Sequence, residues 1–183
     1  HADHVHGIDD LRMIVFNQRA RLQVWADGDT QRDLYARFGY AFVQPKDSPY
    51  PPILDMNTID GPFEIRGKGG AISLVPFEVN HGSIEALGFR MGGLVYLPDV
   101  AEMSDEGWLA VEGADVWVLD ALRREPHPTH SHLAQSLEWI KEAAPKRAVL
   151  TNMHIDMDHA TVDAETPDHI TPAFDGMVIH SDY

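Results

Sequence analysis

The spacing of apolar residues predicts a chain rich in strands, with helices between them. Apolar runs indicate strands over residues 22–26, 63–66, 71–79, 87–91 and 94–97, and buried strands over residues 115–120 and 146–151. Helical spacing indicates helices over residues 7–16, 29–42 and 104–111, and a further helix that carries Leu133, Leu137 and Ile140. This order predicts an α/β or α+β fold in a single domain, residues 1–183.

One segment shows no such pattern. Residues 44–62 contain Pro45, Pro49, Pro51, Pro52 and Pro62, and we predict a long irregular loop there. Loops of this length in a compact domain are often lids or binding loops. We therefore expect this segment to help form a substrate pocket.

Composition narrows the classes of partner. The chain has 29 acidic and 14 basic residues and a net charge of -15, which opposes the binding of a long nucleic acid. It has no cysteine, so any bound metal must be held by His, Asp or Glu. No apolar run approaches the length of a membrane span, and we expect a cytoplasmic protein without a membrane partner.

Candidate metal ligands lie next to the predicted elements. Four of them follow strands and three precede the first helix: His81, Asp99, His130 and His154 in the first group, and His1, Asp3 and His4 in the second. The ends of several strands in one sheet can converge on one rim, where rigid elements hold ligands well. One such residue alone is more often a surface group, but the whole set indicates a metal centre. Imidazole and carboxylate ligands without thiolate suit Zn, Mn or Fe(II).

Five spaced motifs resemble those of metallo-β-lactamase-fold hydrolases. His1-Ala2-Asp3-His4 is similar to the last four residues of the family's His-x-His-x-Asp-His motif. The later matches are Val79-Asn80-His81-Gly82, Tyr96-Leu97-Pro98-Asp99, His127-Pro128-Thr129-His130 and Thr151-Asn152-Met153-His154. Residues 127–130, 153–158 and 172–177 resemble in particular the branch with the cyclic phosphodiesterase of phosphonate utilisation, which has ribonuclease Z-like relatives. The resemblance implies an αββα sandwich, here lacking its first strands.

The same resemblance implies a two-metal centre with Mn²⁺ or Zn²⁺. His1 and His81 would bind the first ion, Asp3, His4 and His154 would bind the second, and Asp99 would bridge the two. A hydroxide between the ions would be the nucleophile, and His130, which matches an extra active-site histidine, would be a general acid. The implied activity is hydrolysis of a small cyclic or nucleotide-like phosphodiester. A homodimer is left open.

One departure and three alternatives stand beside this interpretation. The motif's leading histidine, two residues before His1, is not in the chain, and we expect an upstream segment to supply it together with the missing strands. The fold also hosts tRNA-processing endonucleases resembling ribonuclease Z, but the basic arm that they use is not visible here. It hosts thioesterases and lactamases too, for which residues 127–130 are the wrong signature. A non-catalytic metal-binding module is the third alternative.

Overall fold

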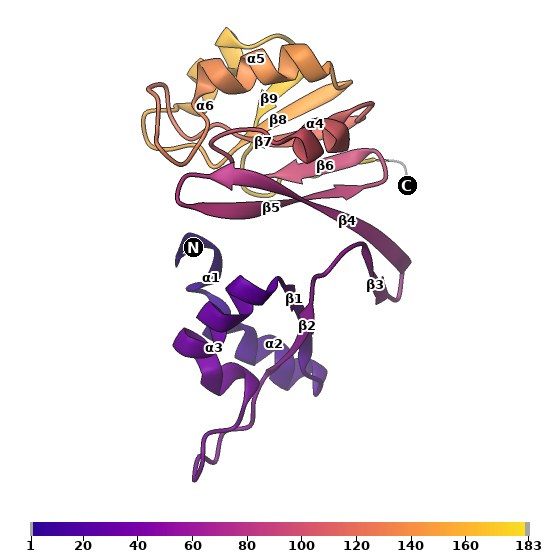
Figure 1. Ribbon diagram of the computed structural model, residues 1–183, viewed down its shortest axis with the longest axis vertical. Coiled ribbons are helices and arrows are strands. Elements are labelled where there is room, and N and C mark those ends of the chain that lie inside the picture. Colours follow the sequence, from indigo (N-terminus) through magenta and orange to yellow (C-terminus); the bar gives the residue numbers. More distant parts are fainter. Residues whose placement is uncertain (1, 182–183) are drawn as a thin grey trace. The chain divides into compact units, whose positions relative to one another are not determined.

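The computed structural model describes residues 2–181 and divides into two compact units, His1–Gly61 and Pro62–Tyr183 (Figure 1). The first unit contains the helices α1 (Ala2–Val5), η1 (Ile8–Asp10), α2 (Leu11–Gln18) and α3 (Gly28–Phe42), with the strands β1 (Leu22–Ala26) and β2 (Leu54–Thr58). A single domain over residues 1–183 stays a prediction.

The first unit is built around a β-α-β connection. Strands β1 and β2 pair in parallel, with Leu22 opposite Leu54, and α3 forms the crossover between them. The predicted strand over residues 22–26 is confirmed. The prediction of an irregular loop over residues 44–62 is wrong where β2 lies. The density of prolines hid this strand, but Pro52 is the last of them before it, so every residue of β2 has an N–H group.

Helix α3 begins at an aspartate cap. The Asp27 carboxylate accepts hydrogen bonds from the backbone N–H groups of Asp29 and Thr30, both at 2.9 Å, and from Thr30 Oγ1 at 2.6 Å. Burial of Asp27 raises its pKa, but these hydrogen bonds favour the charged form and leave the pKa lowered overall. The cap explains why the helix starts where the chain leaves β1.

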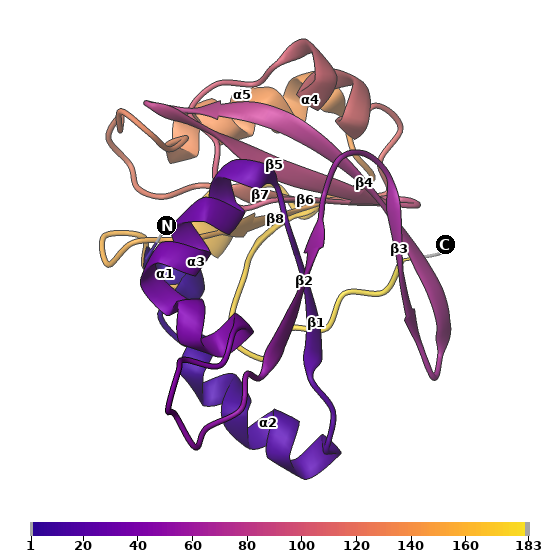
Figure 2. The ribbon, with the colours of Figure 1, turned by 60° about the horizontal axis from the view of Figure 1, so that its bottom comes forward.

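The second unit contains one seven-stranded mixed sheet. Its strands occur in chain order: β3 (Phe63–Gly67), β4 (Gly70–His81), β5 (Ile84–Met91), β6 (Leu94–Leu97), β7 (Val116–Asp120), β8 (Arg147–Thr151) and β9 (Ile170–Pro172). Neighbours from β3 to β6 are antiparallel, and those from β6 to β9 are parallel. Figure 2 shows β4 continuing beyond the main sheet into the hairpin with β3. The predicted mixed class of strands and helices is confirmed.

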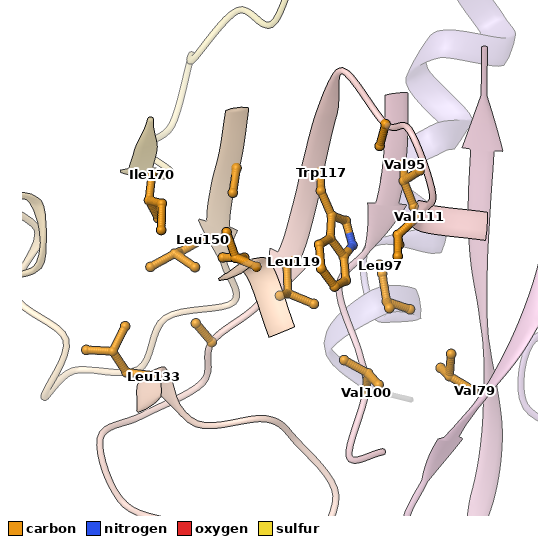
Figure 3. Packing of buried hydrophobic residues seen from close by; sticks show 14 of the residues in the cluster. Val79, Val95, Leu97, Val100, Val111, Trp117, Leu119, Leu133, Leu150 and Ile170 are labelled. Carbon is orange, nitrogen blue, oxygen red and sulfur yellow. The ribbon is translucent and has the colours of Figure 1, made fainter. Parts of the chain in front are cut away.

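Helices cover one face of this sheet. Residues of α4 (Asp105–Val111), α5 (Leu133–Ala143) and α6 (His159–Glu165) join the strand residues in one buried cluster (Figure 3). Trp117 and Leu119 of β7 lie at its centre with no exposed surface. The opposite face of the sheet carries a smaller buried cluster. In it, Val116, Val118 and Val149 pack against Leu94, Ala173, Met177 and Ile179. None of the described helices is long and apolar enough to cross a membrane.

One close contact joins β4 to β5. Phe77 lies opposite Gly88 in the strand register, and a Cβ atom added at Gly88 would come within 2.2 Å of Phe77 Cζ. The Phe77 ring is 4% exposed, so the surrounding core limits its movement. The glycine therefore makes room for the aromatic ring between the two strands.

Candidate metal centre

Four strands of the second unit end at the same edge of the sheet. Strands β6, β7 and β8 are parallel neighbours, and β4 runs in the same direction as β6 because both are antiparallel to β5. The carboxyl ends of these strands are the usual place for a site in a sheet of this kind. The residues found there are His81 at the end of β4, Asp99 after β6, Asp120 at the end of β7 and Asn152 after β8.

Three of the predicted site residues meet at this edge. His81, Asp99 and His130 offer ligand atoms that all lie within 4.8 Å of one another. His81 is 1% exposed, and its ring lies edge-on to that of His130 with 4.6 Å between centroids. His130 Nδ1 is 3.6 Å from Asp99 Oδ1. Two imidazoles and a carboxylate, with no thiolate, form a donor set that fits a divalent transition metal.

Burial affects the protonation of His81. Desolvation lowers its pKa, and the charge of Asp99 opposes that shift. A lowered pKa keeps the imidazole neutral at physiological pH, which is the form that binds metal. A hydrogen bond to the backbone of Thr129 also acts on the His81 ring. The loop that carries Thr129 approaches His81 closely because Gly82 has no side chain; a Cβ atom there would lie 2.5 Å from Thr129 Cγ2.

A buried carboxylate lies behind His130. Asp120 has no exposed surface, and its Oδ2 is 2.8 Å from His130 Nδ1. Desolvation raises the pKa of Asp120, and the hydrogen bond with His130 acts in the opposite direction. The hydroxyl groups of Ser131 and Ser136 both donate to the Asp120 carbonyl at 2.7 Å, which ties the loop and α5 to the end of β7. The Asp120 carboxylate thus binds the His130 ring through Nδ1 and fixes its orientation.

Asn152 joins three strand ends. Its backbone has a φ of 60°, in the left-handed region that asparagine tolerates better than most residues. From there its Nδ2 group is 3.4 Å from each of three oxygens: Pro98 O, Asp99 Oδ1 and Asp120 Oδ1. Asp120 and Asn152 were not predicted as site residues. The available signal was a lone acid at the end of an otherwise apolar strand.

The loop between β7 and α5 is held by an arginine. Arg123 donates from Nε to the carbonyl of Glu125 at 3.0 Å and from Nη2 to that of Pro126 at 2.6 Å. The same loop brings His127 beside His130, with 5.2 Å between ring centroids. Desolvation, with smaller effects of Arg123 and His130, lowers the pKa of His127. His127 therefore lies next to the His130 side of the three-residue group.

The three-residue group found among the described residues does not include the other predicted ligands. His154 is not in the three-residue group found among residues 2–181; its side chain is 61% exposed and its Nδ1 is 3.4 Å from Asp156 Oδ1. Asp3 and His4 belong to α1 of the first unit, with 3.6 Å between His4 Nε2 and Asp3 Oδ2. His1 lies outside the described residues. The complete ligand set stays a prediction.

Comparison with known families identifies the chain. Residues 1–155 match the family described as β-lactamase superfamily domain. The chain belongs to the β-lactamase superfamily. This confirms the resemblance to metallo-β-lactamase-fold hydrolases, and the edge that carries His81, Asp99 and His130 lies within the matched residues.

Solved structures of the superfamily show the same fold. A crystal structure described as a new diphosphatase from the PhnP family is 31% identical, with a TM-score of 0.86; the match covers 100% of this chain and 68% of that one. The short form of human tRNase Z is 17% identical, with a TM-score of 0.65, and the match covers 98% of this chain and 75% of that one. At 17% identity, this second likeness concerns the fold alone.

A curated relative is much longer than this superfamily member. A protein named octanoyltransferase from Porphyromonas gingivalis (strain ATCC BAA-308 / W83) is 27% identical over 186 residues. The match covers 97% of this chain but only 35% of that protein, so the chain spans about a third of the curated relative it matches.

Proposed function

We propose that this superfamily member is a divalent-metal-dependent hydrolase that cleaves a small phosphodiester. The observation that carries the proposal is the strand-end cluster of His81, Asp99 and His130, with the buried Asp120 behind it. The 31% identity to a diphosphatase of the PhnP family supports a phosphorus-centred reaction. Fold alone would not choose a substrate, because this fold hosts several chemistries.

His81 and Asp99 would hold metal at the sheet edge, and the resemblance adds His1, Asp3, His4 and His154 as ligands of a two-ion centre. Bound divalent ions would supply Lewis-acid polarisation of a phosphoryl oxygen and a water molecule of lowered pKa. They would also offset the chain's net charge of -15 at the site, so that an anionic substrate can bind.

The chain's own acid–base group would be His130. Asp120 would accept a hydrogen bond from Nδ1–H, which fixes the ring orientation, and its charge would favour the imidazolium form, in which Nε2–H gives a proton to the leaving-group oxygen. Asn152 keeps Asp99 and Asp120 in place by donating toward both carboxylates. This division of roles assigns Asp99 to metal and Asp120 to His130.

A test of His130 separates acid catalysis from metal binding. We expect His130→Ala to retain its metal and to lower kcat by about 10²–10⁴, the usual worth of a general acid. Metal content by plasma emission spectroscopy and steady-state kinetics are the measurements. If the variant loses metal, His130 is a ligand, and its assignment as the acid is wrong.

A diphosphate diester is the second candidate substrate class, because the 31% identical structure is described as a diphosphatase. The decisive assay therefore compares bis(p-nitrophenyl) phosphate and a cyclic ribose phosphate with a diphosphate diester, using protein loaded with Mn²⁺ or Zn²⁺. We expect turnover of the phosphodiesters and little activity on β-lactams or thioesters.

The controls for this assay come from the chain itself. His81→Ala should abolish activity, whereas His180→Ala, at an exposed position in the C-terminal segment, should not change it. Exclusive turnover of the diphosphate would replace the proposed substrate class. Cleavage of a tRNA precursor in preference to both would favour the ribonuclease Z-like alternative, and metal binding without any turnover would favour the non-catalytic module.

A further inference from the structure

The loop between β7 and α5 carries a histidine that has no part in the proposed metal binding or proton transfer. His127 is half-buried, and its ring lies 5.2 Å from that of His130, centroid to centroid, with 52° between the ring planes. It is not in the group of His81, Asp99 and His130. What the His127 ring can do beside that group depends on which of its nitrogens carries a proton.

Thr129 determines the tautomer of His127. The Thr129 backbone N–H donates to His127 Nδ1 at 3.3 Å, and the Thr129 hydroxyl oxygen is also 3.3 Å from this nitrogen. A backbone N–H is only a donor, so Nδ1 must be an acceptor and carries no proton. In the neutral ring the proton is then on Nε2. His127 therefore presents Nε2–H as a hydrogen-bond donor.

The two neighbouring histidines have opposite surroundings. Desolvation, with the charges of Arg123 and His130, lowers the pKa of His127 and favours its neutral form. His130 Nδ1, in contrast, is 2.8 Å from the Asp120 carboxylate, whose charge favours the imidazolium form. Different environments commonly give two like groups different roles in one site. Here His130 would transfer a proton, and His127 would offer a fixed neutral donor.

The loop holds the His127 ring in place. Arg123 donates to the two carbonyl groups directly before His127. A hydrogen bond from the Leu122 N–H to the Ser131 carbonyl, at 3.0 Å, closes the loop at its base. Supports of this kind keep a side chain in the geometry that binding requires.

The His127 Nε2 atom is available to a ligand. No described residue bonds to it, and it is not buried. Two neighbouring donor groups are engaged within the chain: Asn152 Nδ2 lies near three oxygens, and Arg123 binds carbonyl groups of its own loop. An anionic phosphoryl oxygen is a strong hydrogen-bond acceptor and suits such a donor.

We infer that His127 binds the substrate by donating from Nε2–H to a non-bridging oxygen of the phosphodiester. The identity of this ligand rests on the proposed hydrolysis. A neutral imidazole keeps its remaining proton at physiological pH, so this hydrogen bond orients the phosphoryl group and transfers no proton. Proton transfer to the leaving-group oxygen stays with His130. Loss of His127 should therefore weaken substrate binding, whereas loss of His130 should slow the chemical step.

The first test is ¹⁵N NMR of the His127 ring in the Zn²⁺-loaded protein. We expect a protonated Nε2 and an unprotonated Nδ1. Thr129→Val should show the same tautomer, because it removes the hydroxyl group and keeps the backbone N–H. Dimethyl phosphate, a phosphodiester monoanion without a good leaving group, should shift the Nε2–H signal in a saturable way. A ring protonated mainly on Nδ1, or no shift on titration, would overturn the inference.

The second test compares two substitutions of His127. His127→Phe keeps a ring but loses the donor, and should weaken dimethyl phosphate binding by about 10–100-fold, the usual worth of a hydrogen bond to a charged group. His127→Gln, with an amide N–H near the position of Nε2, should bind more tightly than His127→Phe. His180→Phe, at an exposed position, is the control and should bind like the wild type. Calorimetric titration of the Zn²⁺-loaded proteins gives the Kd values.

Kinetics separate this inference from the proposed function. With bis(p-nitrophenyl) phosphate, His127→Phe should raise KM and leave kcat little changed, unlike His130→Ala. An unchanged Kd in His127→Phe, or an equal loss in both His127 variants, would overturn the inference. If neither variant folds, the Nε2–H signal of the wild type gives the answer. Dimethyl phosphate binding through His127 without turnover of any diester would support the inference and contradict the proposed hydrolysis. Turnover with KM and Kd unchanged in His127→Phe would do the reverse.

Discussion

Single residues at strand ends carry most of the chemistry in the second unit. His81, Asp99 and His130 were predictable because each follows an apolar run, and imidazole or carboxylate after a strand is a usual ligand pattern. Asp120 and Asn152 were not, because the sequence does not show which strands are neighbours. The parallel register that places Asp120 opposite Thr151 brings the two residues together. The placement of the buried Asp120 beside the site therefore follows from the pairing of β7 with β8, which the sequence does not show.

Replacing the Asp120 carboxylate tests its role as a positioning residue. We expect Asp120→Asn to lower kcat by about 10²–10⁴ with little change in KM, because the amide no longer holds His130 in the required tautomer. The ¹⁵N chemical shifts of the His130 ring should report the change of tautomer independently of activity.

The matched control is Asp115→Asn, at a carboxylate that pairs with Lys146. It should change neither kcat nor the His130 ring signals. If Asp120→Asn leaves the tautomer and kcat unchanged, Asp120 does not position His130.

At the scale of elements, pattern and capping predicted most of the helices and strands. Outside the proline-rich segment, every strand of at least four residues was predicted from its apolar run. The helix expected after Ser104 begins where the Ser104 hydroxyl caps it. Besides α1, which has only four residues, two short elements were missed for physical reasons. Strand β9 has only three residues, too few to show alternation, and α6 is mostly polar and buries only Val162. Strand β9 is held by its pairing with β8, and α6 begins at Asp158, whose carboxylate accepts from the Thr161 N–H.

The Asp27 cap predicts a stability change that depends on pH. Asp27→Ala should destabilise α3 by about 1 kcal/mol near neutral pH, the usual worth of an N-cap. Because the pKa of Asp27 is lower in the folded state than its ordinary value of 3.8, the cap stabilises the fold above that value. The difference between wild type and variant should therefore shrink as the pH falls below 3.8.

Amide hydrogen exchange of α3, measured at neutral and acidic pH, reads out this effect locally. Asp33→Ala, at an exposed position within the same helix, serves as the control and should change stability by only a few tenths of a kcal/mol in the usual range for surface sites. A variant effect at Asp27 that grows on acidification would contradict the prediction.

The contact between β4 and β5 predicts a second effect at this scale. Gly88→Ala should lower the free energy of unfolding by about 1–3 kcal/mol, because its Cβ would force the buried Phe77 ring out of place. Gly67→Ala in β3 is the control, since a Cβ atom there meets nothing within 4 Å. Chemical denaturation of both variants checks the difference, and equal stabilities would show that the Phe77 ring adapts freely.

At the scale of the whole molecule, the fold class followed from the order of strands and helices, and the family from the spacing of its motifs. The division into two compact units did not, because it depends on which segments contact each other across the chain. The net charge of -15 argues against a long nucleic acid as partner, which stays a prediction, and it does not identify the substrate. Substrate choice is decided by the shape and donors of a site, which periodicity does not encode.

Metal removal should destabilise the protein. An ion that binds only the folded state adds stability, about 2.7 kcal/mol at a free concentration of 100 times Kd. We expect a chelator to lower Tm and Mn²⁺ or Zn²⁺ to restore it, whereas Ca²⁺, which prefers six to eight oxygen ligands, should not. Differential scanning calorimetry is the measurement. A Tm that does not respond to chelation would argue against a structural contribution of metal at the His81 and Asp99 edge.

Asn152 imposes an unusual restriction on how this sequence can vary. Its backbone, at a φ of 60°, disfavours most side chains by about 1–2 kcal/mol. Glycine accepts that backbone but cannot donate to Asp99 and Asp120, and aspartate accepts it but would add a third carboxylate beside those two. Spontaneous deamidation would produce the same aspartate. Position 152 thus needs both a residue that tolerates the left-handed backbone and a side chain that donates without charge. Substitution and deamidation at this position should therefore both disturb the site.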